Sequence, residues 1–306
     1  MLLLRIAVGL GLLGVIAAVA GWFASAPRGL SAAEIAALPE GDAARGEAVF
    51  WAGGCASCHA APDAKGDDKL SLGGGRVLAS DFGDFVAPNI SMDREDGIGS
   101  WSEADFANAM LRGVSPEGEH FYPSFPYTSF TRMNHGDIAD LWAFWQTLPA
   151  VEGKAPGHRL AFPFNIRRGI GLWKLAFLSD APVIAIDTSD PKLVRGRYLV
   201  EGPGHCGECH TSRDIAGGLD YGLWLAGAPN PDGRGRIPNI TGGEGGIGSW
   251  SESDIAYYLE SGFTPDFDSV GGSMVAVQEN MAKLESWDRE SIAAYLKAVP
   301  AHATAP

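Results

Sequence analysis

The sequence contains two copies of the motif Cys-x-x-Cys-His, which combines two thiols and an imidazole within five residues. The two thiols of such a motif can form thioether bonds to a porphyrin, and the adjacent imidazole can bind its iron, which is the attachment pattern of a c-type haem. We therefore predict two covalently attached haem c groups, each with one iron. The residues that would hold them are Cys55, Cys58 and His59 in the first copy, and Cys206, Cys209 and His210 in the second.

Two other kinds of site share part of this pattern, namely a structural zinc site and a redox-active dithiol. Zinc would require each motif to find two further nitrogen or sulfur ligands in tetrahedral geometry. A dithiol does not require a histidine after the second cysteine in both copies. Because the chain's four cysteines all lie in the two motifs, none remains for a disulfide or for a thiolate nucleophile.

His59 and His210 are each predicted to supply one axial nitrogen to an iron. A ligating histidine also needs a hydrogen-bond partner for its other ring nitrogen, since that bond sets the tautomer and the orientation of the ring. The backbone carbonyls of Pro88 and Pro238 are the candidates, because each belongs to a rigid proline. The alternative is that both prolines serve only in turns.

The sixth iron ligand decides between electron transfer and the binding of a small ligand. A methionine thioether raises the reduction potential and closes the iron, whereas an open position suits a substrate or a peroxide. In the second copy Met274 lies in the loop before the last predicted helix and is the predicted ligand. Met281 also precedes that helix and is the alternative.

The first copy lacks a matching methionine. Sliding the chain by the repeat offset of 149 residues places Phe125 opposite Met274, and phenylalanine cannot bind iron. Met133 lies shortly before the last helix of this copy and is the predicted ligand, although a methionine there can also serve only in packing. His120 and His135 are the remaining candidates.

The motifs are part of a longer repeat, in which paired segments keep one order at an offset near 150 residues. This pattern predicts two tandem copies of one domain. The chain then divides into an N-terminal segment over residues 1–26, a first domain over 27–156, an apolar interdomain segment over 157–188 and a second domain over 189–306. The paired segments are Ala44–Gly46 with Val194–Gly196, Pro88–Ser91 with Pro238–Thr241, and Gly97–Glu103 with Gly246–Glu252.

Each copy is predicted to be mostly helical, because the same start and stop signals recur in both. They are an N-cap before the helix that leads into the motif, a capping box, a glycine stop and a last amphipathic helix. The N-caps are Asp42 and Asp190, the capping boxes Ser100–Glu103 and Ser249–Glu252, the stops Gly113 and Gly262, and the last helices 137–147 and 287–297.

The N-terminal segment carries a signal about the compartment. After Arg5 the chain runs without a charge from Ile6 to Ala26, which is long enough to cross a ~30 Å hydrocarbon core as a helix. An uncleaved membrane anchor over residues 6–26 is the prediction, and a cleaved secretory signal that ends at Ala26 is the alternative. Either one places the body of the protein outside the cytoplasmic membrane, facing the periplasm, with Arg5 left inside.

The interdomain segment over residues 157–188 is apolar, whereas a solvated linker would be polar and flexible. We expect it to pack against both domains and to fix how the two haems are placed. The alternative is a helix on the membrane surface that uses Arg167, Arg168 and Lys174.

The composition is acidic, with 23 basic and 37 acidic residues and a formal net charge of −14. The sequence shows no basic stripe of the kind that neutralises phosphates, so nucleic acid is not an expected partner. An acidic surface favours docking to basic redox proteins and acts mainly on the association rate.

These motifs together resemble a known family, the dihaem and trihaem cytochrome c subunits of membrane-bound periplasmic dehydrogenases for alcohols, gluconate and similar substrates. The resemblance extends over most of residues 40–306. It departs from the family in having no third Cys-x-x-Cys-His and in having Phe125 where the family has a methionine. Beyond the haem motifs, the matching segments are Pro88–Ile90, Gly97–Glu103 and Tyr122–Tyr127.

The resemblance implies an all-α chain of two tandem class I cytochrome c domains, in which a first helix crosses a last helix at Gly46 or Gly196. It also implies His/Met iron and electron transfer without a substrate of its own. The donor would be a periplasmic dehydrogenase or a quinol-oxidising bc1-type complex, and the acceptor an oxidase or a soluble cytochrome. The alternative is a dihaem peroxidase that works at an open first haem, with Glu117, Glu119 or His120 as its acid or base.

Overall fold

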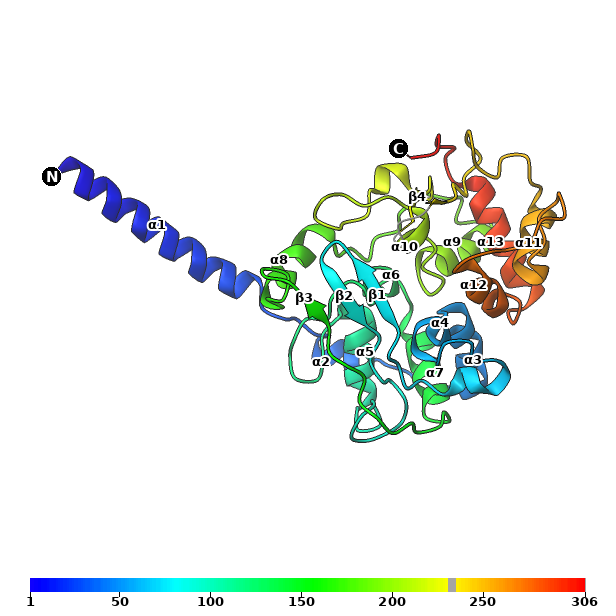
Figure 1. Cartoon of the computed structure of the whole chain (residues 1–306), viewed down its shortest axis with the longest axis horizontal. Coiled ribbons are helices and arrows are strands. Elements are labelled where there is room, and N and C mark those ends of the chain that lie inside the picture. The colour runs from blue at the N-terminus through cyan, green and yellow to red at the C-terminus, as the bar shows by residue number, and fades with distance from the viewer. Residues whose placement is uncertain (231–234, 306) are drawn as a thin grey trace.

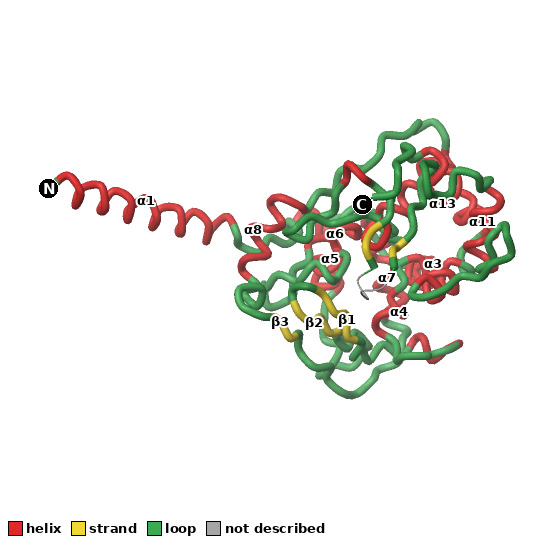
Figure 2. The backbone as a smooth tube through the Cα atoms, turned by 45° about the horizontal axis from the view of Figure 1, so that its top comes forward, coloured by secondary structure: helices red, strands yellow, loops and turns green. Residues whose placement is uncertain are grey.

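A computed structural model describes residues 1–230 and 235–305, apart from the side chains of residues 2, 4 and 7. The chain consists of a long N-terminal helix, α1 (Leu2–Ala24), and two packed halves (Figure 1). The helix projects away from the body, in which the N-terminal half lies beside the C-terminal half. Figure 2 shows the same arrangement from a second direction, with loops making up much of both halves.

The two halves repeat one order of helices. In the first half, α3 (Ala43–Ala52) leads into the motif helix α4 (Cys55–His59), and α5 (Glu103–Arg112) and α7 (His135–Trp145) follow. The same places in the second half are taken by α9 (Pro191–Glu201), α10 (Gly207–His210), α11 (Glu252–Ser261) and α13 (Ser286–Ala298). The other helical segments are α2 (Ala32–Ala36), α6 (Tyr127–Phe130), α8 (Arg168–Phe177), α12 (Met274–Met281) and the short turns η1 (Gly66–Leu70) and η2 (Tyr221–Leu223).

A first helix crosses a last helix in both halves, as the resemblance implied. Helix α3 packs on α7, and α9 packs on α13. A Cβ atom on Gly46 would overlap the carbonyl oxygen of Asp140 in α7. A Cβ atom on Gly196 would overlap the carbonyl oxygen of Ser291 in α13 in the same way. Only a residue without a side chain permits so close an approach of two backbones.

An ion pair clamps each crossing. Arg45 Nε lies 2.7 Å from a carboxylate oxygen of Asp140, and Arg195 Nε lies 2.8 Å from one of Asp288. Both guanidinium groups donate a second hydrogen bond to the same carboxylate, which gives the fork-like geometry of a strong pair. The arginine that precedes the glycine in both repeats therefore ties the first helix to the last.

The predicted helix signals are present, with one exception. Asp42 accepts a hydrogen bond from the backbone of its helix at 3.0 Å, and Asp190 does so at 2.8 Å. Gly113 and Gly262 end their helices in the left-handed conformation, with φ of 59° and 78°.

The capping boxes lie two residues later than predicted. They are formed by Ser102–Asp105 for α5 and by Ser251–Asp254 for α11. The predicted Ser100–Glu103 was wrong because a turn occupies the chain before the helix, in which Trp101 N donates to the carbonyl of Ile98. Serine and an acidic residue recur so closely here that spacing alone does not choose between them.

The chain is mostly helical, and the prediction that it is all-α needs correction. Strands β1 (Val77–Ser80), β2 (Gly83–Val86) and β3 (Arg159–Leu160) form an antiparallel sheet in the order β1-β2-β3. Strands β4 (Ala228–Pro229) and β5 (Arg236–Ile237) form a second, antiparallel pair. These strands are too short for a pattern of alternating hydrophobicity to reveal them.

The segment over residues 157–188 contacts both halves. Lys174 of α8 is buried and donates to the carbonyl oxygens of Arg112 and Gly113 at 2.7 Å each, at the end of α5. Trp173 Nε1 donates to the carbonyl of Ala216 in the second half at 2.9 Å. Because Lys174 is turned into the protein, it does not serve the membrane-surface alternative.

No helix in the described part of the chain is long and apolar enough to cross a membrane, so the span predicted over residues 6–26 is not found there.

Candidate haem-attachment sites

The two motifs lie on short helices that follow the first helix of each half. A helical turn places residues i, i+3 and i+4 on one face, so both thiols and the imidazole of a motif point to the same side. Burial raises the pKa of the Cys55 and Cys206 thiols to about 12. This is the opposite of the lowered pKa of a thiolate nucleophile, and it suits thiols that are used up in thioether bonds.

The zinc alternative would need a cluster of ligating side chains around each motif. Among the residues that the structure describes, no group of three or more His, Cys, Asp or Glu side chains could hold a metal ion. The donor set at each motif, two thiols and one imidazole, matches the three bonds of a c-type haem.

Both motif histidines make the hydrogen bond expected of an iron ligand. His59 Nδ1 lies 2.8 Å from the carbonyl oxygen of Pro88, and His210 Nδ1 lies 2.8 Å from that of Pro238. A ring that donates through Nδ1 leaves Nε2 unprotonated for iron. Burial lowers the pKa of His59 to about 4 and also lowers that of His210, so both imidazoles are neutral at pH 7.

A glycine seats each histidine against its proline segment. Gly74 N donates to the carbonyl of His59 at 2.8 Å, and Gly227 N donates to that of His210 at the same distance. A Cβ atom on Gly74 would overlap the carbonyl oxygen of Pro88, and the φ of 74° also disfavours any other residue. The loop is thus shaped to bring the proline carbonyl to the imidazole.

The asparagine after each proline holds that carbonyl in place, a role that the sequence prediction missed. Asn239 is 1% exposed; its Oδ1 accepts from Thr241 N and its Nδ2 donates to the carbonyl of His302, both at 2.8 Å. Asn89 makes the matching bonds, accepting from Ser91 N at 2.9 Å and donating to the carbonyl of Val151 at 2.7 Å. The repeated Pro-Asn-Ile was the signal that could have revealed it.

The structure places Met274 and Met281 at the two ends of one helix. Met274 is the first residue of α12, so the predicted loop before the last helix is in fact helical. It is half-buried, whereas Met281 is buried in the core with Leu284 and Ile292. Met274 also packs against the core, but of the two methionines it is the less buried. Its role as an iron ligand stays a prediction.

Met133 lies in the core beside the second half. It is 5% exposed, and its Cγ would lie 3.8 Å from a Cβ atom built on Gly202, at the end of α9. It precedes α7 as Leu284 precedes α13, and both residues are buried. Phe125 packs in an aromatic cluster, with its ring 5.7 Å from that of Phe130. These contacts suit a packing role for Met133, and its ligation of iron stays a prediction.

The other candidates of the first site are engaged elsewhere or exposed. His120 is buried, and its Nε2 lies 2.9 Å from the carbonyl of Ser25, at the end of α1. Glu119 lies 3.6 Å from Arg167, and Glu117 is exposed. His135 is the first residue of α7 and is partly exposed. The acid and base candidates His120 and Glu119 thus have partners in Ser25 and Arg167.

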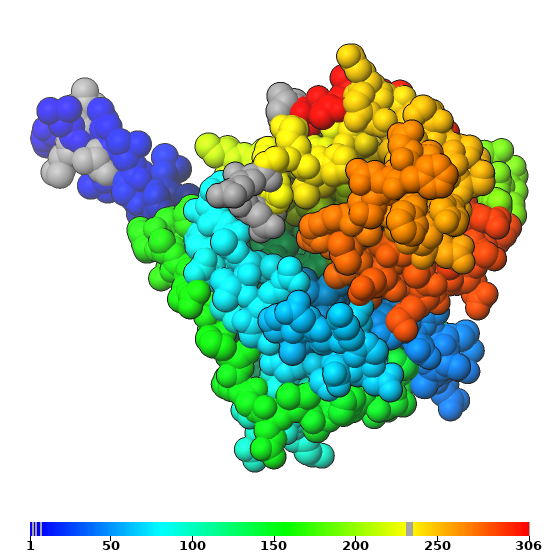
Figure 3. Space-filling view, turned by 45° about the vertical axis from the view of Figure 1, so that its right-hand side comes forward, coloured from blue at the N-terminus to red at the C-terminus, as the bar shows by residue number. Residues whose placement is uncertain are grey.

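Each attachment motif lies at the boundary between the halves and is contacted from the other half. Asn280 Nδ2 of α12 donates to Ser57 Oγ in the first motif at 2.9 Å. The ring of Phe130 stacks on that of His205, next to the second motif, at 5.6 Å. A Cβ atom built on Gly54, just before the first motif, would lie 3.9 Å from the ring of His205, just before the second. Figure 3 shows α12, in orange, seated on the blue atoms of the first half.

Comparison with known proteins agrees with this geometry. The model of the family Cytochrome c matches residues 43–149. The chain is 56% identical over 261 residues to a protein of Cereibacter sphaeroides described as a dihaem cytochrome c-type, and the match covers 85% of this chain and 87% of that protein. The chain belongs to the dihaem c-type cytochromes. It is an electron carrier or an electron-transfer subunit and takes two covalently attached haem c groups, one at each motif.

This dihaem cytochrome is also similar to subunits of larger enzymes. It is 35% identical to the fructose dehydrogenase cytochrome subunit of Gluconobacter japonicus and 34% identical to the cytochrome c subunit of a quinone alcohol dehydrogenase of Gluconobacter oxydans. The matches cover 85% and 92% of this chain but only 53% and 60% of those two proteins. The chain therefore spans little more than half the length of these relatives.

Proposed function

We propose that this cytochrome relays electrons on the periplasmic side of the membrane, from a dehydrogenase or a quinol-oxidising donor to a terminal acceptor. The observation that carries the proposal is the packing of each attachment motif against the other half of the molecule, through Ser57 with Asn280 and through Glu208 with Thr128 and Ser129, which brings both haem sites into one body. When bound, the haems supply the reversible Fe(III)/Fe(II) couples that take and release single electrons. The names of the relatives, cytochrome subunits of fructose and alcohol dehydrogenases, support a dehydrogenase as the donor.

The protein's own groups have defined tasks in this proposal. His59 and His210 bind the irons through Nε2, and the carbonyls of Pro88 and Pro238 fix the two rings. Met274 is the proposed sixth ligand of the second site. Met133 stays the prediction for the first site, and its packing beside the second half makes an iron without a protein thioether the other outcome to test.

We propose that α1 associates the protein with the cytoplasmic membrane. Its described apolar side chains are exposed from Leu3 to Phe23, and Arg5 is the only charge in its sequence. Arg168 of α8 fastens its end to the body, because the guanidinium lies 4.4 Å above the ring of Trp22 and donates to Ser25 Oγ at 3.0 Å. Fractionation and sequencing of the mature N-terminus test this, since a soluble protein that begins near Pro27 would contradict it.

The relay is tested with holoprotein and with membranes of a strain that lacks its gene. We expect ferric holoprotein to be reduced when those membranes oxidise fructose, gluconate or an alcohol, or when a quinol is supplied. We also expect a far-red charge-transfer band of thioether-ligated ferric haem. Absence of that band from both haems, together with no reduction by any donor, would contradict the proposal.

The expected partners follow from charge. A carrier with a net charge of −14 should dock to basic redox proteins, so the rate of electron transfer should fall as salt screens the attraction. A rate that does not depend on ionic strength would argue for docking through apolar surface instead.

A further inference from the structure

A buried carboxylate lies inside the second attachment motif, at a position that bonds to neither haem nor iron. Glu208 stands between Cys206 and Cys209, and its side chain is 10% exposed. The electron relay itself requires no acidic residue there. Burying a carboxylate costs free energy unless it is well paired, so its partners indicate what it does.

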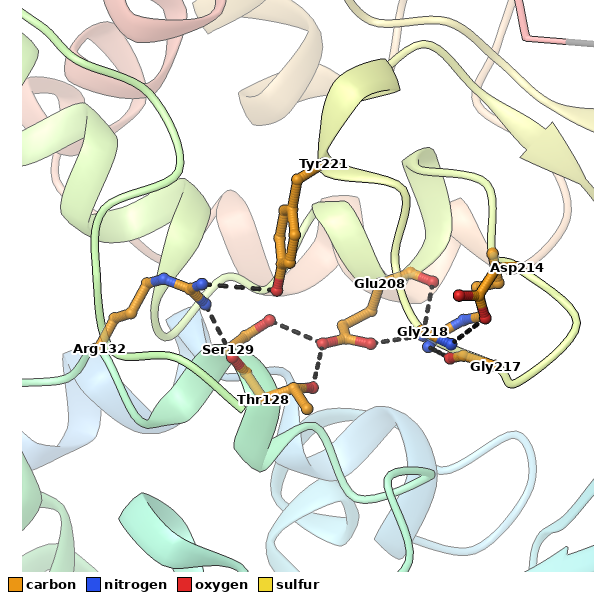
Figure 4. Close-up of polar contacts among 9 residues, drawn as sticks. Thr128, Ser129, Arg132, Glu208, Asp214, Gly217, Gly218 and Tyr221 are labelled. Carbon is orange, nitrogen blue, oxygen red and sulfur yellow. Dashed lines mark hydrogen bonds and ion pairs between the residues drawn. The ribbon is translucent and has the colours of Figure 1, made fainter. Parts of the chain in front are cut away.

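Those partners come from both halves of the molecule. Thr128 and Ser129 of α6, in the first half, donate to Glu208 Oε1 at 2.7 and 2.8 Å (Figure 4). Arg213, in the second half, pairs with Oε2. Arg213 is itself held by the carbonyl of Gly217 at 2.9 Å. The carboxylate thus joins a fixed cation of its own half to two hydroxyl groups of the other.

Helix α6, which carries the two hydroxyl groups that bind Glu208, is itself held in place. Arg132 donates to the carbonyl of Thr128 at 2.7 Å and reaches Tyr221 of the second half at 3.5 Å (Figure 4). It also donates to the carbonyl of Ala181 in the interdomain segment at 2.9 Å. The turn that carries the two hydroxyl groups is therefore held in the orientation that Glu208 needs.

The first attachment motif is docked in the reciprocal manner. Ser57 occupies in the first motif the position that Glu208 occupies in the second, 151 residues later. Its partner Asn280 stands in turn 151 residues after Ser129. Each motif is therefore contacted by the turn or helix that precedes the last helix of the other half, as in a two-fold arrangement. The contact at Glu208 is the charged one of the two and hence the stronger.

We propose that Glu208 is a positioning residue for electron exchange between the haems: by docking α6 onto the second attachment motif, it sets the two haem groups in one fixed relation. This proposal rests on the proposed electron relay and concerns one step of it, the transfer of an electron from one haem to the other. With both haems bound, that step would pass one electron from one iron to the other, so that one would be oxidised as the other is reduced, with no proton or bond exchanged. Exchange over a fixed path depends on the distance and orientation of the groups, so loosening this contact should slow it.

The test uses holoprotein variants on both sides of the contact. Glu208→Gln keeps the shape of the side chain but removes its charge. The double variant Thr128→Val with Ser129→Ala removes both donors without changing either motif, so that haem attachment is preserved. The matched control is Glu244→Ala, an exposed glutamate of the second half whose side chain makes no hydrogen bond in the described part of the chain.

Three readouts are measured at equal haem content. Amide hydrogen exchange in α6 and α10 should accelerate about tenfold or more, because hydrogen bonds to a charged group are stronger than neutral ones and are lost in the variants. The circular-dichroism couplet of two interacting haems in the Soret region should be lost or weakened. The rate of exchange between the haems after pulsed reduction should fall, while the absorption spectra show unchanged ligation.

If the double variant left both the rate of electron exchange between the haems and the circular-dichroism couplet unchanged, the docking role of Glu208 would be overturned. This result is distinguishable from failure of the relay. A wild-type protein with a strong couplet and fast internal exchange that accepts electrons from no donor would contradict the proposed function and leave the role of Glu208 standing.

Discussion

The strongest single test of how the second site is built is Asn239→Ala. In the folded protein this buried side chain links the segment after the last helix to the chain beside Pro238. Removing it takes away the acceptor of Thr241 N and the donor to the carbonyl of His302, both at 2.8 Å. The substitution therefore acts on the carbonyl that orients His210, without touching the motif itself.

The size of the effect follows from these contacts. The two short hydrogen bonds contribute about 1 kcal/mol each, and a third, to the carbonyl of Glu244 at 3.4 Å, is weaker. The N–H of Thr241, a residue that is 0% exposed, is left unpaired at a cost of about 1–3 kcal/mol. The carbonyl of His302 still accepts a hydrogen bond from the hydroxyl of Thr241 at 3.3 Å, so this carbonyl is not left without a donor. We expect a decrease of about 2–4 kcal/mol in the free energy of unfolding.

The assay is guanidinium unfolding of holoprotein followed by haem absorbance, together with a redox titration. A weaker hydrogen bond at Nδ1 makes the imidazole less basic, so the potential of the second haem should rise while that of the first stays unchanged. The matched control is Asn165→Ala, an exposed asparagine, which should change stability by less than about 0.5 kcal/mol. A loss below that size in Asn239→Ala, with both potentials unchanged, would refute this account of the site.

Three further predictions concern ligation, packing and pH. Met274→Ala should remove the far-red thioether band of one haem and Met133→Ala that of the other; a spectrum unchanged by Met133→Ala assigns that residue to packing. Gly46→Ala should lower the free energy of unfolding by about 3 kcal/mol, because the added methyl group would overlap the backbone of α7. The control Gly169→Ala, which has open space around it in α8, should raise the free energy of unfolding by about 0.5–1 kcal/mol. Equal effects of the two substitutions in urea unfolding would contradict the close helix crossing at Gly46. Burial lowers the pKa of His158, so the unfolded chain binds more protons and stability should fall as the pH drops below about 6.5. His158→Phe should lose that part of the pH dependence, and an unchanged profile would show that this histidine does not cause it.

Local patterns could be predicted well because their physics lies within a few residues. The N-cap at Asp42 and the stop at Gly113 depend on one turn of helix. The bonds from His59 and His210 to the proline carbonyls were also foreseen, since a ligating imidazole needs an acceptor and the repeat marked where it stands. The capping boxes were misplaced where two candidate pairs overlapped, and spacing alone could not rank them.

The sequence-based predictions were wrong where a segment is very short or where contacts with other parts of the fold decide its secondary structure. The strands of two to four residues carry no pattern of their own and exist because neighbouring loops are brought alongside. Helix α12 replaced a predicted loop because one of its faces packs against the first half, including the contact of Asn280 with Ser57. The ligation of iron by Met133 stays a prediction, since a methionine before a last helix can bind iron or fill the core and its place in the sequence does not choose between them.

Two haem attachment motifs, the repeated segments around them and the choice of His59 and His210 as expected iron ligands could all be read from the amino-acid sequence. These properties are encoded in residue types and short spacings. The folded structure was needed to see that each motif packs against the other half and that Glu208 joins the second motif to α6. The contacts responsible connect residues 80 and 223 positions apart, Thr128 with Glu208 and Ser57 with Asn280. Such pairs leave no local pattern, because packing of the two halves, rather than the chain between them, brings them together.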